Sequence, residues 1–217
     1  TGRPARVAAG RNAHKTFLSA VGLLDLDVEW LYPENEAGYL ACPVTPVGLT
    51  ARLSQMKAEG RLPSAVYLTS PDYLGNMVNL RPLAEVCHKY GVLLLVDNAH
   101  GAYLHFLQPS LHPLDLGADL CCDSAHKTLP VLTGGAYLHI SGNFPEEITA
   151  QAKNAMAIFG STSPSYLILQ SLDKCNEYIA DDYPKKLAAT IEKLAAVKTF
   201  LQKQGWEIMD GDPLKLT

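Results

Sequence analysis

Short apolar runs recur along the chain, separated by longer amphipathic segments. The most apolar run, Val92 to Val96, carries no charge until Asp97 follows it. Continuous apolar runs of this length are typical of strands that are covered on both faces of a sheet. The pattern predicts strands at Arg6 to Ala9, Asp27 to Tyr32, Ala65 to Thr69, Val92 to Val96, Leu120 to Cys122 and Ala136 to Ile140.

The segments between these runs have helical spacing and helix-end residues. Asn12 is expected to cap a helix over His14 to Leu24, and Asn79 one that ends at Gly91. Thr45-Pro46 places a hydroxyl N-cap before a proline at the first helical position. Apolar positions at helical spacing support these helices: Leu49, Leu53 and Met56 before Gly60, and Leu83, Val86, Cys87 and Tyr90.

The last third of the sequence has two further helical segments. Ser163-Pro164 is expected to start a helix that runs to about Ala180 and is broken at Pro184. A long amphipathic helix then follows, with its apolar positions at Leu187, Ile191, Leu194, Val197 and Leu201.

Alternating strands and helices predict an α/β fold with a mostly parallel sheet and helices on both faces. We see no internal repeat and no low-complexity linker. Residues 1–204 are expected to form one large domain, and residues 205–217 the start of a second domain. Trp206 to Met209 is interpreted as the first strand of that second domain.

Composition excludes several function classes. A formal net charge of −4 does not favour a nucleic-acid or membrane-surface partner, no apolar run is long enough to cross a membrane, and no signal peptide is visible. The five cysteines are odd in number and have no CxxC spacing, which argues against a disulfide scaffold or a zinc site. We expect reduced thiols in a cytoplasmic protein.

Three polar segments follow predicted strands: Thr69-Ser-Pro71, Asp97-Asn-Ala-His100 and Ser124-Ala-His-Lys127. Ligands of parallel sheets bind beyond the carboxyl ends of the strands, so these segments predict the functional site. Asp97 ends the most apolar run and needs a hydrogen-bonding or cationic partner. That partner is either a protonated pyridine nitrogen, or a loop backbone or basic side chain in a purely structural arrangement.

Lys127 is the only lysine between Lys89 and Lys153, and its neighbours are small and mostly uncharged. A lysine desolvated there would have a lowered pKa and could form a Schiff base. The alternative is an ordinary solvated surface lysine.

Three histidines, His14, His100 and His126, raise the question of a metal. Their spacing has no HxxxH or HxH pattern, so we expect no metal among them. Each is either a polar histidine in the core or a loop, or an imidazole stacked on a cofactor ring. The sequence also has no GxSxG, GxGxxG or Walker-type loop, which leaves hydrolase and nucleotide sites unsupported.

Several segments together make the sequence similar to a known family, the bacterial ornithine/lysine/arginine decarboxylases. These are pyridoxal-phosphate enzymes of the aspartate aminotransferase fold. The segments occur in the family's order: Arg11-Asn-Ala-His-Lys-Thr16, Thr69-Ser-Pro-Asp-Tyr-Leu-Gly75, Val96-Asp-Asn-Ala-His-Gly101, Asp123-Ser-Ala-His-Lys-Thr-Leu129 and Ser161-Thr-Ser-Pro-Ser-Tyr166.

The resemblance implies a role for each matching residue. Lys127 would form the Schiff base with pyridoxal 5'-phosphate, and Asp97 would pair with its ring nitrogen. His14 would stack on the ring, with Ala99 packing from the other side and His100 also in the cofactor site.

The resemblance also implies contacts at the phosphate and at a subunit interface. Ser124 and His126 would lie near the phosphate. Ser161 and Thr162 would reach the site of a neighbouring subunit, because the family builds its sites in homodimers or larger homo-oligomers.

The implied function is decarboxylation of arginine, lysine or ornithine to an amine. The alternatives are an aminotransferase or lyase on the same scaffold, and a cofactor-free regulatory homologue. The family's phosphate-cradling loop would precede Arg11, where only ten residues stand, and the carboxy-terminal domain is nearly absent. We therefore expect a large domain incomplete at both ends, which on its own binds cofactor weakly and is inactive.

Overall fold

A single sheet organises the structure, a computed structural model that describes residues 4–33, 38, 40–160 and 163–217. Its strands are β1 (Arg6–Gly10), β2 (Asp27–Leu31), β3 (Ala65–Thr69), β4 (Leu93–Asp97), β5 (Leu120–Asp123) and β6 (Tyr137–Ile140). They are arranged in the order β2-β1-β3-β4-β5-β6. Only the β5–β6 pairing is antiparallel, so the predicted mostly parallel sheet is confirmed, within a residue or two at the strand ends.

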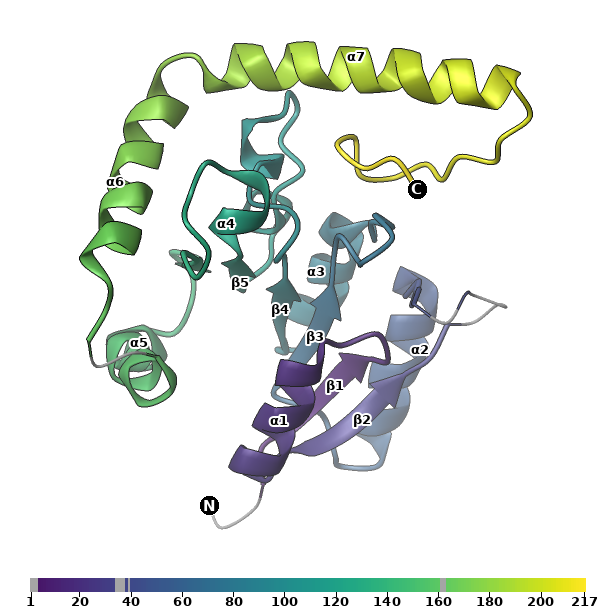
Figure 1. The fold of residues 1–217 in the computed structure, drawn as a ribbon. Helices are drawn as coiled ribbons and strands as arrows, with labels where there is room; N and C mark the ends of the chain where they lie inside the picture. Colours follow the sequence, from purple (N-terminus) through teal and green to yellow (C-terminus); the bar gives the residue numbers. More distant parts are fainter. Residues whose placement is uncertain (1–3, 34–37, 39, 161–162) are drawn as a thin grey trace.

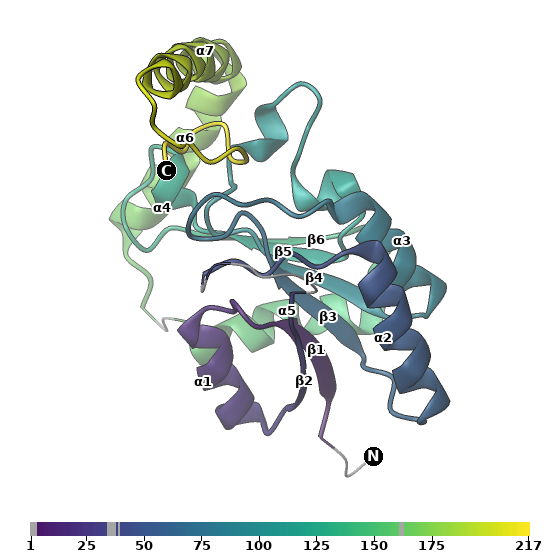
Figure 2. The same ribbon diagram turned by 90° about the vertical axis from the view of Figure 1, so that its right-hand side faces the viewer.

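Helices cover both faces of the sheet (Figures 1 and 2). Their bounds are α1 (Lys15–Leu24), α2 (Pro46–Ala58), α3 (Leu80–Lys89), α4 (Ala125–Thr128), α5 (Glu146–Phe159), α6 (Tyr166–Ala180) and α7 (Tyr183–Lys203). Thr45 caps α2 as predicted. The predicted cap of α1 is wrong, because the side chain of His14, and not that of Asn12, accepts the Thr16 N–H. The sequence pattern also missed α5.

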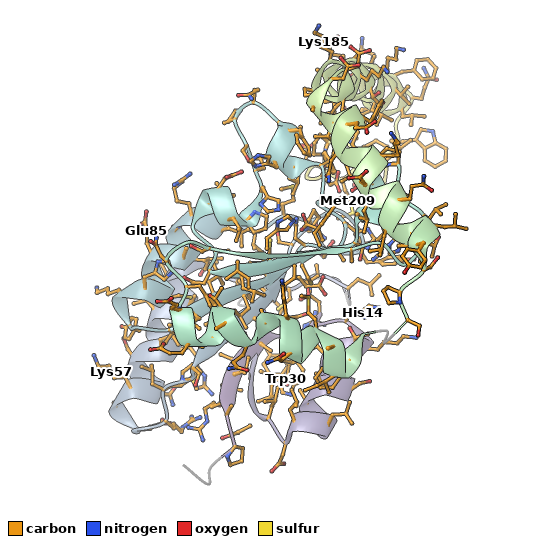
Figure 3. All side chains as sticks on the ribbon, turned by 90° about the vertical axis from the view of Figure 1, so that its left-hand side faces the viewer. His14, Trp30, Lys57, Glu85, Lys185 and Met209 are labelled. Atoms are coloured by element: carbon orange, nitrogen blue, oxygen red, sulfur yellow. The ribbon has the colours of Figure 1, made fainter. Side chains whose placement is uncertain are left out.

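The main core lies between α2, α3 and one face of the sheet. Leu53 of α2, Leu83 of α3 and Leu94 of β4 are completely buried there. Burial of one such side chain contributes roughly 1.5–3 kcal/mol. The outer sides of these two helices carry charged residues such as Lys57 and Glu85, which point away from the sheet (Figure 3).

A smaller core lies on the opposite face, under α1. Phe17 of α1 stacks on Tyr67 of β3 with ring centroids 4.3 Å apart, and it meets Trp30 of β2 edge-on. Because side chains alternate along a strand, Tyr67 reaches this face while its neighbours Val66 and Leu68 face the main core. This second core positions α1, whose first turn reaches the carboxyl ends of the strands.

The helices α6 and α7 form an arm over the carboxyl ends of the strands, and the chain then turns back (Figure 1). The returning segment has no strand at Trp206 to Met209, so that prediction is wrong. It instead packs on the loops after β3 and β4. Asp212 accepts from the Tyr103 hydroxyl after β4, and Lys215 Nζ donates to the Tyr73 carbonyl after β3 at 2.8 Å. The domain boundary at residue 204 stays a prediction.

None of the helices in the described part of the chain combines the length and apolarity needed to cross a membrane.

Candidate functional site

The predicted site lies where three neighbouring parallel strands end. Register pairs Thr69 of β3 with Asp97 of β4, and Asp97 with Cys122 of β5. The three side chains therefore form a row on one face, the same face as α1. They line a cavity of about 300 Å³ whose walls are Asn12, His14, Thr16, Tyr67, Thr69, Tyr73, Asp97, Ala99, His100, Cys122, Ser124 and Lys127.

Asp97 is 7% exposed and makes only neutral hydrogen bonds. Its Oδ2 accepts from the Tyr67 hydroxyl at 3.0 Å, and its Oδ1 accepts from the Ala99 N–H at 3.1 Å. Among the described residues no cationic side chain forms an ion pair with it. A buried carboxylate without a cation is costly, so this position suits a ligand that brings a positive charge.

Lys127 stands on α4, one short turn after β5. Its side chain is exposed, so the expected desolvation of this lysine is wrong. Its Nζ lies 3.4 Å from His100 Nε2 on the cavity wall. Asp97 and Lys127 thus face the same cavity from adjacent strand ends.

His100 is held in its neutral form. Burial is the main cause, and the positive charges of Lys215 and Lys127 add to it, which lowers the pKa of His100 to about 4. The ring also packs edge-on against Tyr73, with centroids 5.9 Å apart. Neutral His100 Nε2 can therefore accept a hydrogen bond from the Lys127 ammonium.

The remaining predicted site residues divide into three groups. His14, Ala99 and Ser124 line the cavity with Asp97, His100 and Lys127. His126 does not line it, because its Nδ1 contacts the Gly135 carbonyl at 3.0 Å.

Ser161 and Thr162 lie outside the described residues. The cofactor contacts expected of all these residues stay predictions.

Sequence reasoning missed several cavity residues. Tyr67 is the clearest, since its hydroxyl donates to Asp97 Oδ2 and its own pKa is raised by burial and by the Asp97 charge. Thr69, which belongs to a segment predicted to form the site, also lines the cavity, and its Oγ1 is buried there without a hydrogen-bond partner among the described residues. Strand alternation could have found Tyr67, because it stands two residues before Thr69 and so shares its face.

The residues present fit pyridoxal phosphate. One cavity, large enough for a small ring, is lined by a buried carboxylate without a cation, by an amine and by a hydroxyl that has no partner among the described residues. A protonated pyridine nitrogen would supply the positive charge that is missing beside Asp97.

The family model described as "Orn/Lys/Arg decarboxylase, major domain" matches residues 3–215. The chain belongs to the Orn/Lys/Arg decarboxylase family. Its curated relatives include the uncharacterized protein YaaO of Bacillus subtilis (strain 168), which is 31% identical and aligns with 95% of this chain. An arginine decarboxylase of Halalkalibacterium halodurans is 30% identical and aligns with 86%.

A lysine decarboxylase is among the similar solved structures. The E. coli constitutive lysine decarboxylase has a TM-score of 0.71 at 20% identity, and the match covers 98% of this chain and 32% of that one. This likeness confirms the fold, which is that of the pyridoxal-phosphate enzymes of the aspartate aminotransferase type. The chain spans 44% and 37% of the length of the two curated relatives.

Proposed function

We propose that this chain forms the cofactor site of a pyridoxal-phosphate enzyme that decarboxylates a basic amino acid, namely arginine, lysine or ornithine. One observation carries the proposal. Asp97 is a buried carboxylate without a cation among the described residues, and it lines the same cavity as the amine of Lys127.

Each residue has a chemical task in this proposal. Pyridoxal phosphate, when bound, supplies an electron sink for the bond broken at the substrate carbon. Asp97 holds a proton on the ring nitrogen, with Tyr67 and the Ala99 N–H fixing its two oxygens. Lys127 would provide the amine that condenses with the cofactor aldehyde, with release of one water molecule. Neutral His100 accepts a hydrogen bond from Lys127 Nζ and so orients it.

Family membership supports the substrate class. Relatives aligned with most of this chain carry the name arginine decarboxylase, and the E. coli structure is a lysine decarboxylase. Asp97 and Lys127 would equally serve an aminotransferase or a lyase, so the substrate class depends on these relatives.

We propose a homo-oligomer as the working form, as the family resemblance implies. All five cysteines are free, which supports a reducing compartment such as the cytoplasm.

The first experiment tests cofactor attachment at Lys127. The purified chain is titrated with pyridoxal phosphate, reduced with borohydride and mapped by mass spectrometry. We expect the label on Lys127 and a visible absorbance that is lost in Lys127→Ala. Lys153→Ala, an exposed lysine on α5, is the control and should keep both signals. A label spread evenly over the lysines, and unchanged in Lys127→Ala, would refute the proposed site.

The second experiment tests the reaction. Release of carbon dioxide from arginine, lysine and ornithine is compared with transfer of their amino groups to a keto acid, using the full-length protein. Carbon dioxide release with a matching amine product is expected. Amino transfer without carbon dioxide release would instead assign the site to an aminotransferase.

A further inference from the structure

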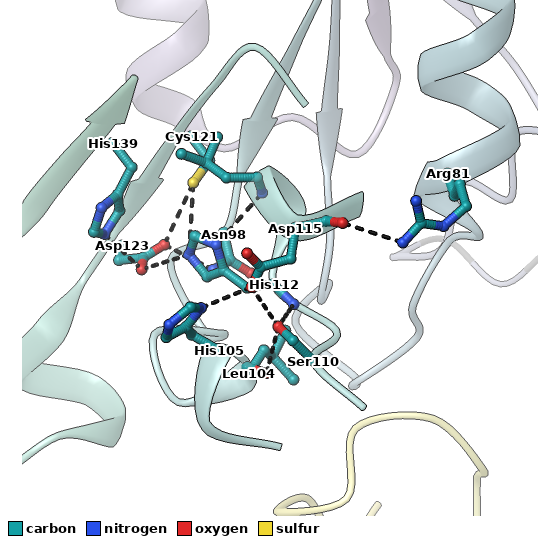
Figure 4. A network of polar contacts seen from close by, with 11 residues as sticks. Arg81, Asn98, Leu104, His105, Ser110, His112, Asp115, Cys121, Asp123 and His139 are labelled. Carbon is teal, nitrogen blue, oxygen red and sulfur yellow. Dashed lines mark hydrogen bonds and ion pairs between the residues drawn. The ribbon is translucent and has the colours of Figure 1, made fainter. Parts of the chain in front are cut away.

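A second polar cluster lies behind the cofactor site, on the other face of the sheet. Side chains alternate along β5, so Cys121 and Asp123 face the side of α2 and α3 while Cys122 faces Asp97. Antiparallel pairing places His139 of β6 opposite Cys121. His112 reaches the same place from the turn before Pro113 (Figure 4).

Three of the side chains, those of His112, Cys121 and Asp123, are close enough to share one ion, and His139 lies beside Asp123. His112 Nε2 lies 3.1 Å from Asp123 Oδ2, and His139 Nε2 lies 3.0 Å from the same oxygen. Cys121 Sγ lies 3.7 Å from His112 Nε2. His112, Cys121 and Asp123 are all buried, and a ligand atom from each lies within 4.8 Å of the others.

Hydrogen bonding alone does not satisfy this cluster. His139 Nε2 is buried 3.0 Å from Asp123 Oδ2, yet it makes no well-aligned hydrogen bond within the described part of the chain. Asp123 Oδ1 is already held by the Asn98 side-chain amide at 2.7 Å, which leaves Oδ2 facing both histidines. Two ring nitrogens therefore face Oδ2, and the Cys121 thiol lies 3.9 Å from Oδ1 of the same carboxylate.

These positions match tetrahedral zinc. Zinc bonds of about 2.0–2.3 Å set neighbouring ligand atoms about 3.3–3.6 Å apart. The separations of 3.1 Å and 3.7 Å around His112 Nε2 lie close to that range. His139 lies outside the group whose ligand atoms are within 4.8 Å of one another, so its ring has to turn toward the other three side chains to become the fourth ligand.

We propose that His112, Cys121, Asp123 and His139 form a zinc site. The ion binds His112 and His139 through Nε2, Asp123 through Oδ2, and Cys121 as a thiolate. On binding, the Cys121 thiol proton leaves to solvent. One thiolate and one carboxylate then balance the two charges of the ion, so the buried site is neutral.

An entry route for the ion is present. A cavity of about 390 Å³ reaches the cluster and is lined by His105, His112, Asp115, Asp123 and His139 among other residues. Binding has one local cost, because His112 Nδ1 would carry the proton and lose the 3.4 Å hydrogen bond from the Leu114 N–H. That long contact is weak compared with a zinc–nitrogen bond.

A neighbouring group competes for the same histidine. His105, His112 and Asp115 also come within ligand distance of one another. Two of these three are exposed, and they contain no thiol. The burial and the mixed nitrogen, sulfur and oxygen donors favour the Cys121 set.

Zinc here would tie together the segments behind the cofactor site. Its ligands come from β5, β6 and the turn at His112, and Asp123 also holds Asn98, the residue after Asp97. The site is thus a structural clamp on the carboxyl ends of β4 and β5, separate from the proposed cofactor cavity.

The test measures metal binding directly, by titrating the metal-free chain with Zn²⁺ and with Co²⁺. We expect one bound ion per chain, and with Co²⁺ a thiolate-to-cobalt band together with the strong visible bands of a tetrahedral site. Cys121→Ser should abolish the thiolate band and weaken zinc binding at least about tenfold. Asp123→Asn should also weaken binding.

Two controls separate this site from others. Cys122→Ser removes the neighbouring thiol on the opposite face and should leave the cobalt spectrum unchanged. His105→Ala disrupts the competing group and should also leave it unchanged. Circular dichroism of each metal-free variant shows whether it is folded.

Three results would overturn the proposal: absence of zinc and cobalt binding by the folded chain, binding that is unchanged in both Cys121→Ser and Asp123→Asn, and binding lost in His105→Ala but kept in Cys121→Ser. The readout needs no pyridoxal phosphate, so its outcome is independent of the proposed function.

Discussion

His100 is expected to stay neutral far below the ordinary pH range of histidine titration. Burial is the first cause, and the charges of Lys215 and Lys127 are the next. The folded pKa of about 4 lies below the ordinary value of 6.5, so the unfolded chain binds more protons between these two values. Folding stability from this group is present above pH 6.5 and is lost as the pH falls through that window.

The size of the effect follows from the two pKa values. Their difference of about 2.5 corresponds to about 3.4 kcal/mol, at 1.36 kcal/mol for each tenfold change. His100 is only partly buried, and water screens part of this energy. We therefore expect acidification to pH 4 to remove about 1–2 kcal/mol of stability through His100.

Two measurements check this expectation. NMR titration of the histidine ring protons gives the pKa of His100 directly, with His100→Gln used to assign the signal. Urea denaturation at neutral and acidic pH compares the native chain with His100→Gln, which should lose less stability on acidification. Lys215→Met and Lys127→Met should each raise the pKa of His100. A His100 pKa near 6.5 in the native chain would contradict the argument from burial and lysine charge.

Two further predictions concern the packing around the site. Tyr67→Phe removes the hydroxyl that donates to Asp97 but keeps the aromatic stack, and it should lower the free energy of unfolding by about 1.5–3 kcal/mol, measured by urea denaturation. An unchanged denaturation midpoint would show that the hydrogen bond does not stabilise the carboxylate. Gly101→Ala would place a Cβ against Asn98 Oδ1 and should cost about 1–3 kcal/mol in thermal denaturation. Gly22→Ala on α1 has open space and is the control, which should not destabilise.

Local signals predicted much of the site. Asp97 and Lys127 were identified because each follows an apolar strand, and strands of a parallel sheet end at one edge. The partners of these residues were harder to foresee. Tyr67 reaches Asp97 because β3 and β4 are adjacent in the sheet, and Cys122 joins them because β5 is the next strand. Strand order is a long-range property, and the spacing of residues along the chain does not contain it.

The outer parts of the molecule also include features that local spacing predicted and features that only tertiary contacts explain. The long helix α7 was predicted from its apolar spacing, whereas α5 was missed, since it buries no side chain in the described structure. The path of residues 206–215 also depends on tertiary contacts. Asp212 and Lys215 bond to Tyr103 and to the Tyr73 carbonyl, more than a hundred positions earlier in the chain.

The sequence by itself determined the strands, most helices and the edge of the sheet where the chemistry lies, because hydrophobic periodicity and helix caps act over a few residues. Only the tertiary structure decided which side chains share a face. It placed Asp97 and Lys127 on one cavity, and it gathered His112, Asp123 and His139 on the opposite face. The reason is physical: pairing in the sheet brings distant strands into register, and a shift of one residue would send each side chain to the other face.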